Sequence, residues 1–478
     1  MTEPIVLTLE RHFTTADLAE DEHPLVPFEV PAGIGRLQVR YEFDHPVSSA
    51  DVGHKEGNIV CIGIFDPRGS GFLQGAGFRG WSGDARPEFV LSPDEATPGY
   101  VAGPIQPGTW HVVLGLQQLH PAGCHVRVTV TLFPGQSTGE FAPPPSPRVL
   151  RTGPAWYCGD LHCHTYHSDG TAPLADLVAA ARAQGLDFLA VTEHNTISHL
   201  PDLAECRGQD LLLIPGEEIT TFHGHANAWG IRSWQEFRCW TTEQMRAVRE
   251  AVRDAGALFS INHPKHEGPE WEYVSDLDAD CVEAWQGPNW FWNFQSLAYW
   301  DGLLRAGKRV VAVGGSDKHQ GPFDGTLSNY EIGTPTTWVW ATELSERAIL
   351  DGIRAGHVFI SLDPRRPRLE MTAEAAGQTA MMGDEMCLPA GSEVVFRCRV
   401  QSAAGNLLRV VTDGEVREMP VDVDDFVYEW VFIATGGRSY VRAEVIEPPE
   451  VPLDEEPAAL LLLALGNPIY VVTGTCQV

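Results

Sequence analysis

The sequence predicts an α/β domain in the middle of the chain, with an all-β, sandwich-like domain on each side. Between residues 148 and 364, short apolar runs alternate with amphipathic helical segments, which indicates repeated βα units and a parallel sheet, open or closed into a barrel. Residues 1–147 and 365–478 instead alternate apolar and polar side chains, as half-buried strands do. A length of 478 residues fits two to four domains.

The predicted strands rest on two patterns. Alternation is clear at residues 37–43 and 126–132 in the first domain, and at 394–400 and 441–445 in the third. Buried parallel strands are continuously apolar, and the middle domain has such runs at 186–192, 211–214, 257–261 and 310–313. Proline-containing segments at 142–147 and 363–367 interrupt sheet pairing and mark the boundaries.

Three helices are expected between the strands of the middle domain. Leu174, Leu177, Val178 and Ala181 form one apolar stripe, with Thr171 as the expected cap and Gly185 as the end. A second helix is expected to begin with a capping box of Thr241 and Gln244. Thr342 is expected to cap a third, which ends at Gly356.

Charge and composition exclude several classes of protein. The net charge of −31 repels phosphate backbones and anionic lipid, so we expect neither a nucleic-acid nor a membrane partner. The N-terminus lacks the apolar core of a secretory signal, and the chain has no apolar run of about 20 residues. Ten scattered cysteines without a CxxC pair favour reduced thiols and a cytoplasmic location.

Histidine or carboxylate clusters follow nearly every predicted strand of the middle domain. They are His162 and His164 with Asp169, Glu193 and His194, Glu217 and Glu218, His223 and His225, His263, Glu283, and Asp317 with His319. The carboxyl ends of parallel strands are where α/β barrels build active sites. Imidazole and carboxylate ligands without paired thiols suit Zn, Mn or Fe. Because there are more ligands than one ion needs, we expect two or three divalent metal ions.

Several assignments stay open. Adjacent strand residues face opposite ways, so only one of Glu217 and Glu218 should enter the site, and the spacing from Gly216 favours Glu218. His223 and His225 share a face in an extended segment, and His225 is preferred. Glu193 and Glu283 could each bind metal or support a ligand. Cys163, between two ligand positions, is expected to pack away from them.

Three basic residues beside ligand positions are candidates for catalysis. Lys265, His266 and Lys318 could each meet an anionic substrate or protonate a leaving group, and Lys318 is favoured because predicted ligands flank it. Five tryptophans lie between Trp271 and Trp300. They predict either an aromatic wall over the metals or a packing seam.

The order of these motifs resembles the PHP (polymerase and histidinol phosphatase) superfamily, and more closely its CehA/McbA branch. The similar segments are Gly159-Asp160-Leu161-His162, Thr192-x-His194-Asn195-Thr196, Ile261-Asn262-His263-Pro264 and Gly314-Gly315-Ser316-Asp317-x-His319. Glu193 stands where the family usually has aspartate.

The resemblance implies a distorted (β/α)7 TIM-like barrel with three metal ions. One ion would be held by His162, His164 and Asp317, a second by Glu218 as bridge with His225 and His263, and a third by Asp169, His194 and His319. The implied activity is a multinuclear hydrolase that uses a metal-bridging hydroxide on a small-molecule ester, with phosphoesters favoured. The alternatives are hydrolysis of carbamates or carboxylic esters of aromatic substrates, and a non-catalytic, metal-stabilised binding protein. A proofreading-type nuclease is opposed by the net charge of −31.

Overall fold

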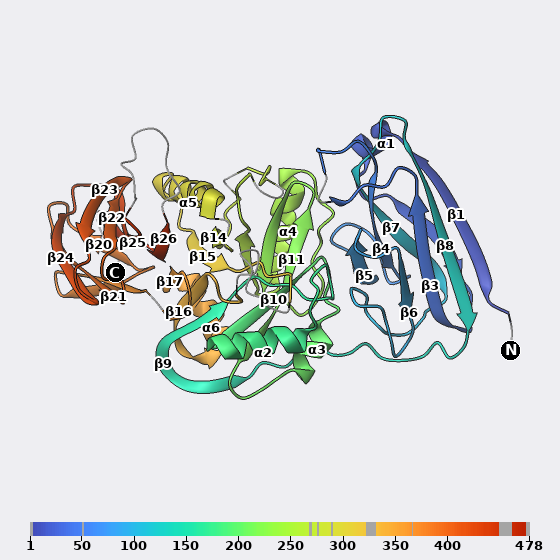
Figure 1. The fold of residues 1–478 in the computed structure, drawn as a ribbon, viewed down its shortest axis with the longest axis horizontal. Coiled ribbons are helices and arrows are strands. Elements are labelled where there is room, and N and C mark those ends of the chain that lie inside the picture. Colours follow the sequence, from blue (N-terminus) through green and yellow to red (C-terminus); the bar gives the residue numbers. More distant parts are fainter. Residues whose placement is uncertain are drawn as a thin grey trace.

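The computed structural model arranges the chain as three parts in a row along its longest axis (Figure 1). It describes residues 3–49, 52–266, 270–274, 277–287, 290–321, 331–365, 367–448 and 461–474, without the side chains of residues 290 and 291. The N-terminal part lies at one end, the C-terminal part at the other, and the α/β part between them.

The N-terminal part is a pair of four-stranded antiparallel sheets. Its elements are β1 (Ile5–Phe13), α1 (Thr15–Glu20), β2 (Leu25–Val30), β3 (Ile34–Phe43), β4 (Ile59–Phe65), β5 (Phe78–Gly83), β6 (Glu88–Leu91), β7 (Gly108–Gln118) and β8 (Cys124–Pro134). The strand orders are β1-β8-β3-β6 and β2-β7-β4-β5. Alternate residues of β3 and β8 point into one core, where they pack with side chains from β4 and β7. They share this core because successive residues of a strand face opposite sides of the sheet.

The middle part has a mixed sheet with helices around it. Its elements are β9 (Val149–Asp160), α2 (Leu174–Gln184), β10 (Phe188–His194), α3 (Leu200–Glu205), β11 (Leu212–Thr221), β12 (Gly224–Trp229), α4 (Thr242–Asp254), β13 (Leu258–Ile261), β14 (Cys281–Gln286), α5 (Trp290–Arg305), β15 (Val311–Gly315), β16 (Thr336–Ser345), α6 (Glu346–Ala355) and β17 (Val358–Ser361). The strand order is β15-β14-β13-β12-β11-β10-β9-β16-β17. The predicted α/β class is confirmed.

The sheet curls so that its distant strands approach each other. The Thr337 hydroxyl in β16 donates to the carbonyl of Gly314 in β15, at 2.7 Å. Beyond the strand ends, the Asp317 amide donates to the His162 carbonyl at 2.8 Å. Strands β12 and β16 run antiparallel to their neighbours, which departs from a regular βα repeat. The (β/α)7 barrel therefore stays a prediction.

Two of the three predicted helix caps are corrected. Helix α4 has the expected capping box of Thr241 and Gln244. Helix α2 begins after Pro173, and Thr171 instead donates to the Gly321 carbonyl. Helix α6 is capped by Ser345, because the strand β16 continues through Thr342 to that residue.

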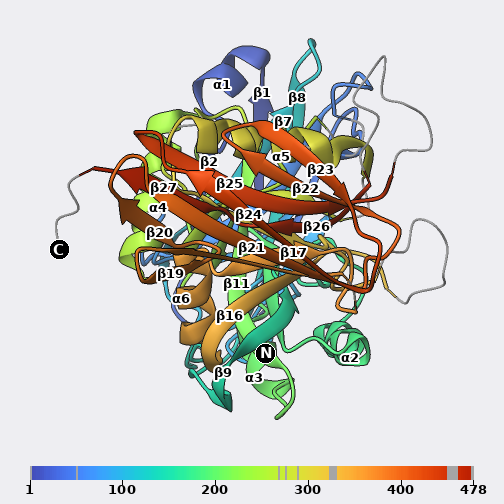
Figure 2. The ribbon, with the colours of Figure 1, turned by 90° about the vertical axis from the view of Figure 1, so that its left-hand side faces the viewer.

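The C-terminal part is a two-layer β structure (Figure 2). Its strands are β18 (Arg368–Ala375), β19 (Gln378–Met381), β20 (Glu385–Leu388), β21 (Glu393–Gln401), β22 (Leu407–Thr412), β23 (Glu415–Pro420), β24 (Asp425–Ile433), β25 (Arg438–Ile446), β26 (Leu462–Gly466) and β27 (Ile469–Thr473). One layer is β19-β18-β21-β24. The other continues the middle sheet, because β26 pairs with β17. The expected C-terminal β structure is therefore present, joined to the α/β part through a shared sheet.

The structure also tests two expectations that were based on composition. None of the helices in the described ranges has the length and apolar composition to cross a membrane. Among the cysteines in the described ranges, eight are free thiols, as expected. Cys387 in β20 is disulfide-bonded, which corrects the expectation of reduced thiols at that position.

Candidate metal centre

Glu218 is the centre of the histidine and carboxylate cluster. Its Oε1 lies 3.3 Å from His162 Nε2, 3.2 Å from His225 Nδ1 and 3.4 Å from His263 Nε2. Its Oε2 lies 3.4 Å from His164 Nε2 and 2.8 Å from His194 Nδ1. One carboxylate of β11 is thus shared by histidines from four other strands or strand ends.

Three groups of candidate ligands have donor atoms within 4.8 Å of one another. The inner group is His162, His164 and Asp317; the central group is His194, Glu218 and His225; the outer group is His164, Asp169, His194 and His319. The inner group has the membership implied by the family resemblance, and the outer group adds His164 to it. In the central group His194 takes the place implied for His263, which still approaches Glu218.

The backbone adopts a left-handed conformation at or beside three candidate ligands at the strand ends. Asn195, His263 and Asp317 have positive φ angles of 54°, 27° and 51°. Such angles are uncommon for residues other than glycine and cluster at functional sites. Gly315 completes this geometry: a Cβ there would lie 2.4 Å from the His162 Cβ and 2.8 Å from Glu283 Oε1.

The alternation of strand residues separates the paired candidates. Glu217 faces away from the cluster, and its Oε2 accepts from the Gln235 amide at 2.9 Å. His223 lies between Glu272 and Glu22, at 2.6 and 2.7 Å, rather than beside Glu218. Cys163 also points away, with its Sγ 3.1 Å from the Ala190 carbonyl.

Further polar side chains orient the candidate ligands. Glu283 Oε1 contacts His162 Nδ1 at 3.0 Å, and its Oε2 accepts from the His263 amide at 3.1 Å. The Asn262 amide donates to Glu218 Oε1 at 2.9 Å. A partner on the second ring nitrogen fixes the orientation of a metal-binding histidine. These contacts favour the supporting role for Glu283.

Glu193 has a similar role toward the loop that carries Asp169. Its carboxylate accepts from the Thr165 amide at 3.0 Å, from the Thr165 hydroxyl at 2.5 Å and from the Ser168 hydroxyl at 2.6 Å. All three donors belong to the segment between His164 and Asp169. The Glu193 contacts therefore favour support of this loop over direct ligation.

Burial and neighbouring charges shift the pKa values of the candidate ligands. Burial opposes ionisation of Glu218, but His162, His194 and His225 outweigh it and hold its pKa well below its usual range. Burial, with the neighbouring His319 and His194, lowers the pKa of His164 to about 3. For Glu218 and His164, these directions favour the ionised carboxylate and the neutral imidazole, which are the forms that bind metal ions.

The centre opens to solvent on the side of the outer group. The side chains of His162, His164 and Glu218 are fully buried, whereas Asp169 is 49% exposed. His194 and His319 have intermediate exposure. A substrate would therefore approach from the side of Asp169.

The three catalytic candidates lie in different surroundings. The Lys265 ammonium donates to Gln286 Oε1, and the Gln286 amide donates to Asp317, so Lys265 is joined to the inner group. Lys318 is buried and pairs with Cys163 in an isolated bridge. His266 is 65% exposed and pairs with Glu270, and the structure does not bring it to the cluster. Gln286 carries no sequence signal for this role, because its side chain is neither charged nor an imidazole.

The aromatic segment splits between core and surface. Trp285 and Trp300 are fully buried in the same core as Tyr273. Trp292 stacks with Phe294, which is 38% exposed. The buried members support the packing interpretation, whereas the side chains of residues 290 and 291 lie outside the described set.

The donor set fits divalent ions. His162 Nε2 and His164 Nε2 are buried without a hydrogen-bond partner, and both point at the carboxylates of Glu218 and Asp317. Buried polar atoms without partners are costly unless something else satisfies them. Imidazoles and carboxylates, with no thiol among them, suit Zn, Mn or Fe.

Comparison with known proteins finds a family match within the middle part of the chain. Residues 160–263 match the family model of the PHP domain. The 5'-3' exoribonuclease of Haemophilus influenzae is 44% identical over 64 residues, which are 13% of this chain and 23% of that protein. The chain therefore spans about a quarter of that relative, and the likeness is local.

Two solved structures align with this chain at low similarity. A two-domain protein from Bacteroides vulgatus, containing a predicted PHP-like metal-dependent phosphoesterase, is 17% identical, with 67% of this chain and 98% of that chain covered and a TM-score of 0.38. A metal-dependent phosphoesterase candidate from Bifidobacterium adolescentis is 20% identical, with 36% and 92% covered and a TM-score of 0.27. Both TM-scores are below 0.5, so the likeness to a known family rests on the match of residues 160–263.

The matched segment contains seven of the nine candidate ligands, from His162 to His263. The narrower CehA/McbA branch stays a prediction. The predicted resemblance to the PHP superfamily is confirmed over residues 160–263, which match the model of its domain.

Proposed function

We propose that this protein is a metal-dependent hydrolase of small-molecule esters, with phosphoesters as the favoured substrates. The observation that carries the proposal is the position of Glu218, whose two oxygens meet histidines of all three ligand groups. A structural metal site is closed and four-coordinate. A larger set of ligands that opens to solvent at Asp169 instead suits catalysis.

The chain's own residues would hold two or three divalent ions and orient the ester. The inner, central and outer groups are the candidate sites for these ions. When bound, such ions lower the pKa of a water molecule and stabilise charge on the ester oxygens. Lys265, held by Gln286 beside Asp317, adds a positive charge that would favour an anionic phosphoester.

The proposed substrate is small. The H. influenzae relative is named as an exoribonuclease, but the likeness covers a local segment. A net charge of −31 opposes binding of a polyanion, whereas a single phosphoester can be offset by bound cations. We therefore propose no nucleic-acid partner.

A substrate panel on metal-defined protein tests the proposal. Protein loaded with Mn or Zn should hydrolyse p-nitrophenyl phosphate or its diester faster than naphthyl carbamates, and chelation should abolish turnover. His263→Ala should lower the rate at least tenfold, since it removes a contact of Glu218. Turnover of carbamates alone would establish the carboxyl-ester alternative. If the protein binds metal tightly but hydrolyses none of these substrates, the result would favour the non-catalytic, metal-stabilised binding protein.

A further inference from the structure

We propose that Arg86, in the N-terminal part, is a positioning residue for the outer ligand group of the metal centre. The inference rests on the proposed function and extends it, because it gives the N-terminal β structure a role in one metal site. Arg86 lies in the turn between β5 and β6, outside the segment that matches the PHP family.

Asp169 is a candidate ligand that lies in a loop rather than in a strand. It lies five residues beyond His164, and its side chain is the most exposed among the outer group. Its Oδ1 lies 3.3 Å from His319 Nε2 and 3.5 Å from His194 Nε2. The conformation of residues 165–168 therefore sets whether Asp169 can complete the outer group.

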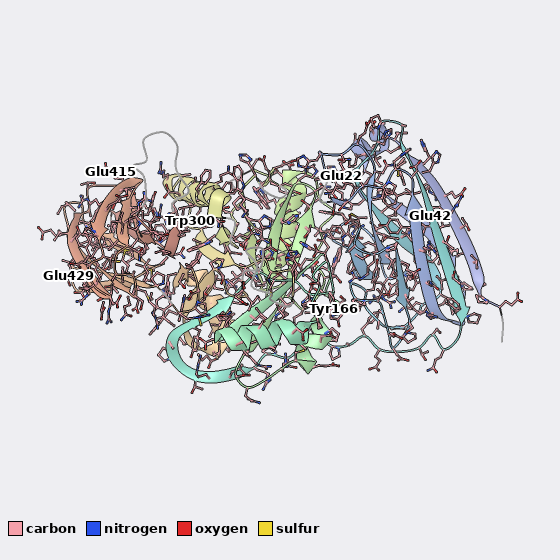
Figure 3. All side chains as sticks on the ribbon, viewed as in Figure 1. Glu22, Glu42, Tyr166, Trp300, Glu415 and Glu429 are labelled. Carbon is pink, nitrogen blue, oxygen red and sulfur yellow. The ribbon has the colours of Figure 1, made fainter. Side chains whose placement is uncertain are left out.

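Arg86 holds this loop from the N-terminal part. Its guanidinium donates to the Ser168 carbonyl at 2.8 Å and to the Tyr166 carbonyl. Tyr166 lies where the middle part faces the N-terminal part (Figure 3). A planar guanidinium suits this task, because its rigid fork binds two acceptors at once. Both carbonyls belong to the segment that leads directly to Asp169.

A second contact fastens the same region. Gly99 of the N-terminal part donates its amide to the Ser198 hydroxyl at 3.0 Å, and its carbonyl accepts from Thr196 at 2.8 Å. The Ser198 hydroxyl in turn contacts His167 Nδ1 at 2.8 Å. The loops that follow His164 and His194 are thus both tied to the N-terminal part.

The two supports of the Asp169 loop differ in origin. Glu193 holds Thr165 and Ser168 from within the middle part, whereas Arg86 holds the loop from the outside. Loss of Arg86 should therefore loosen the loop without moving Glu218 or the inner group. Removal of residues that orient metal ligands typically weakens metal binding about 10- to 100-fold.

Equilibrium dialysis of the full-length protein against a series of free Mn²⁺ concentrations tests the inference. In Arg86→Ala one Mn²⁺ equivalent should need about 10- to 100-fold more free metal, with the other equivalents unchanged. Arg86→Lys should recover part of this affinity, because an ammonium can still donate to one carbonyl. Arg127→Ala is the matched control, since Arg127 of the same part is exposed and pairs with Glu10 and Glu42.

The outcomes separate the inference from the proposed function. Wild-type protein that binds less than one Mn²⁺ would overturn the proposed function itself. Arg86→Ala with wild-type affinity at every equivalent would overturn the inference alone. Equal weakening of all equivalents in Arg86→Ala, or no difference between Arg86→Lys and Arg86→Ala, would also overturn it, because general destabilisation gives that result.

Discussion

Glu217 and Glu218 are neighbours in β11, yet their carboxyl groups meet opposite environments. Glu218 lies among imidazoles that keep its pKa well below its usual range although it is buried. Burial raises the pKa of Glu217 well above its usual range, and its only described partner is an amide. The pair therefore isolates the effect of a charge in the metal centre from the effect of a buried carboxyl group.

Glu218→Gln should lower Mn²⁺ affinity and ester hydrolysis more than a hundredfold, because it removes the charge shared by the three ligand groups. Glu217→Gln should keep both near the wild-type level, since glutamine resembles the neutral acid and retains an acceptor for the Gln235 amide. Metal content and initial rates of the two variants give the comparison. Similar losses in both would contradict the central role of Glu218.

His23 predicts an acid-sensitive contact between the N-terminal and middle parts. Its ring stacks on Phe222 at 5.2 Å and meets Phe237 edge-on at 5.4 Å. Burial, with a smaller effect of Arg238, lowers its pKa from 6.5 to about 3. The unfolded chain therefore binds a proton at His23 more readily than the folded chain does. The stability that the buried neutral His23 contributes is complete above about pH 6.5 and is lost as the pH falls toward 3.

His23→Phe should remove this loss. Between about pH 7.5 and 5, the wild type should lose about 2 kcal/mol more free energy of unfolding than the variant. Denaturant unfolding in the presence of chelator measures how the free energy of unfolding of each protein changes with pH, without a contribution from bound metal. His12→Phe, at an exposed position, is the control and should keep the wild-type slope. Parallel slopes for His23→Phe and the wild type would contradict the assignment.

At the scale of elements, helix caps show where the chain stops forming strand and begins forming helix. Ser345 accepts from the Ala348 amide and begins α6, whereas Thr342 is exposed in β16. Ser345→Ala should lower the free energy of unfolding by about 1 kcal/mol. Thr342→Ala should change it by less than about 0.5 kcal/mol. Chemical denaturation measures both, and a larger cost at Thr342 would contradict the observed cap.

At the scale of the whole molecule, three parts depend on contacts between them. The C-terminal part shares a sheet with the middle through β17 and β26. Arg442 in β25 pairs with Asp301 in α5 at 3.1 Å, and both are buried. His223 of the middle part pairs with Glu22, which Figure 3 shows at the boundary with the N-terminal part. Ligands bound in the middle part should therefore stabilise the whole chain.

Metal loading should raise the melting temperature. An ion that binds only the folded chain adds about 2.7 kcal/mol at a hundredfold excess over its Kd. Calorimetry with chelator and with increasing Mn²⁺ measures the shift. Glu218→Gln should show a smaller shift than the wild type, and a melting temperature independent of Mn²⁺ would contradict a metal centre.

Some of the site follows from local patterns. A strand places residues i and i+2 on one face, so the pairing of His162 with His164 and the exclusion of Cys163 could be expected from position alone. The same rule left His223 and His225 open, because both share a face of an extended segment. The Gly224 backbone turns there with a φ of 129°, and only His225 reaches Glu218.

The sequence by itself determined the α/β class, the flanking β structure and the residue types for a metal centre, because periodicity and strand-end position are local properties of the chain. Only the tertiary structure decided that β26 extends the middle sheet, that Gln286 joins Lys265 to Asp317, and that Arg86 reaches the Asp169 loop. Each of these contacts joins segments far apart in sequence, and no periodic pattern specifies which distant side chain will meet a given backbone carbonyl or amide.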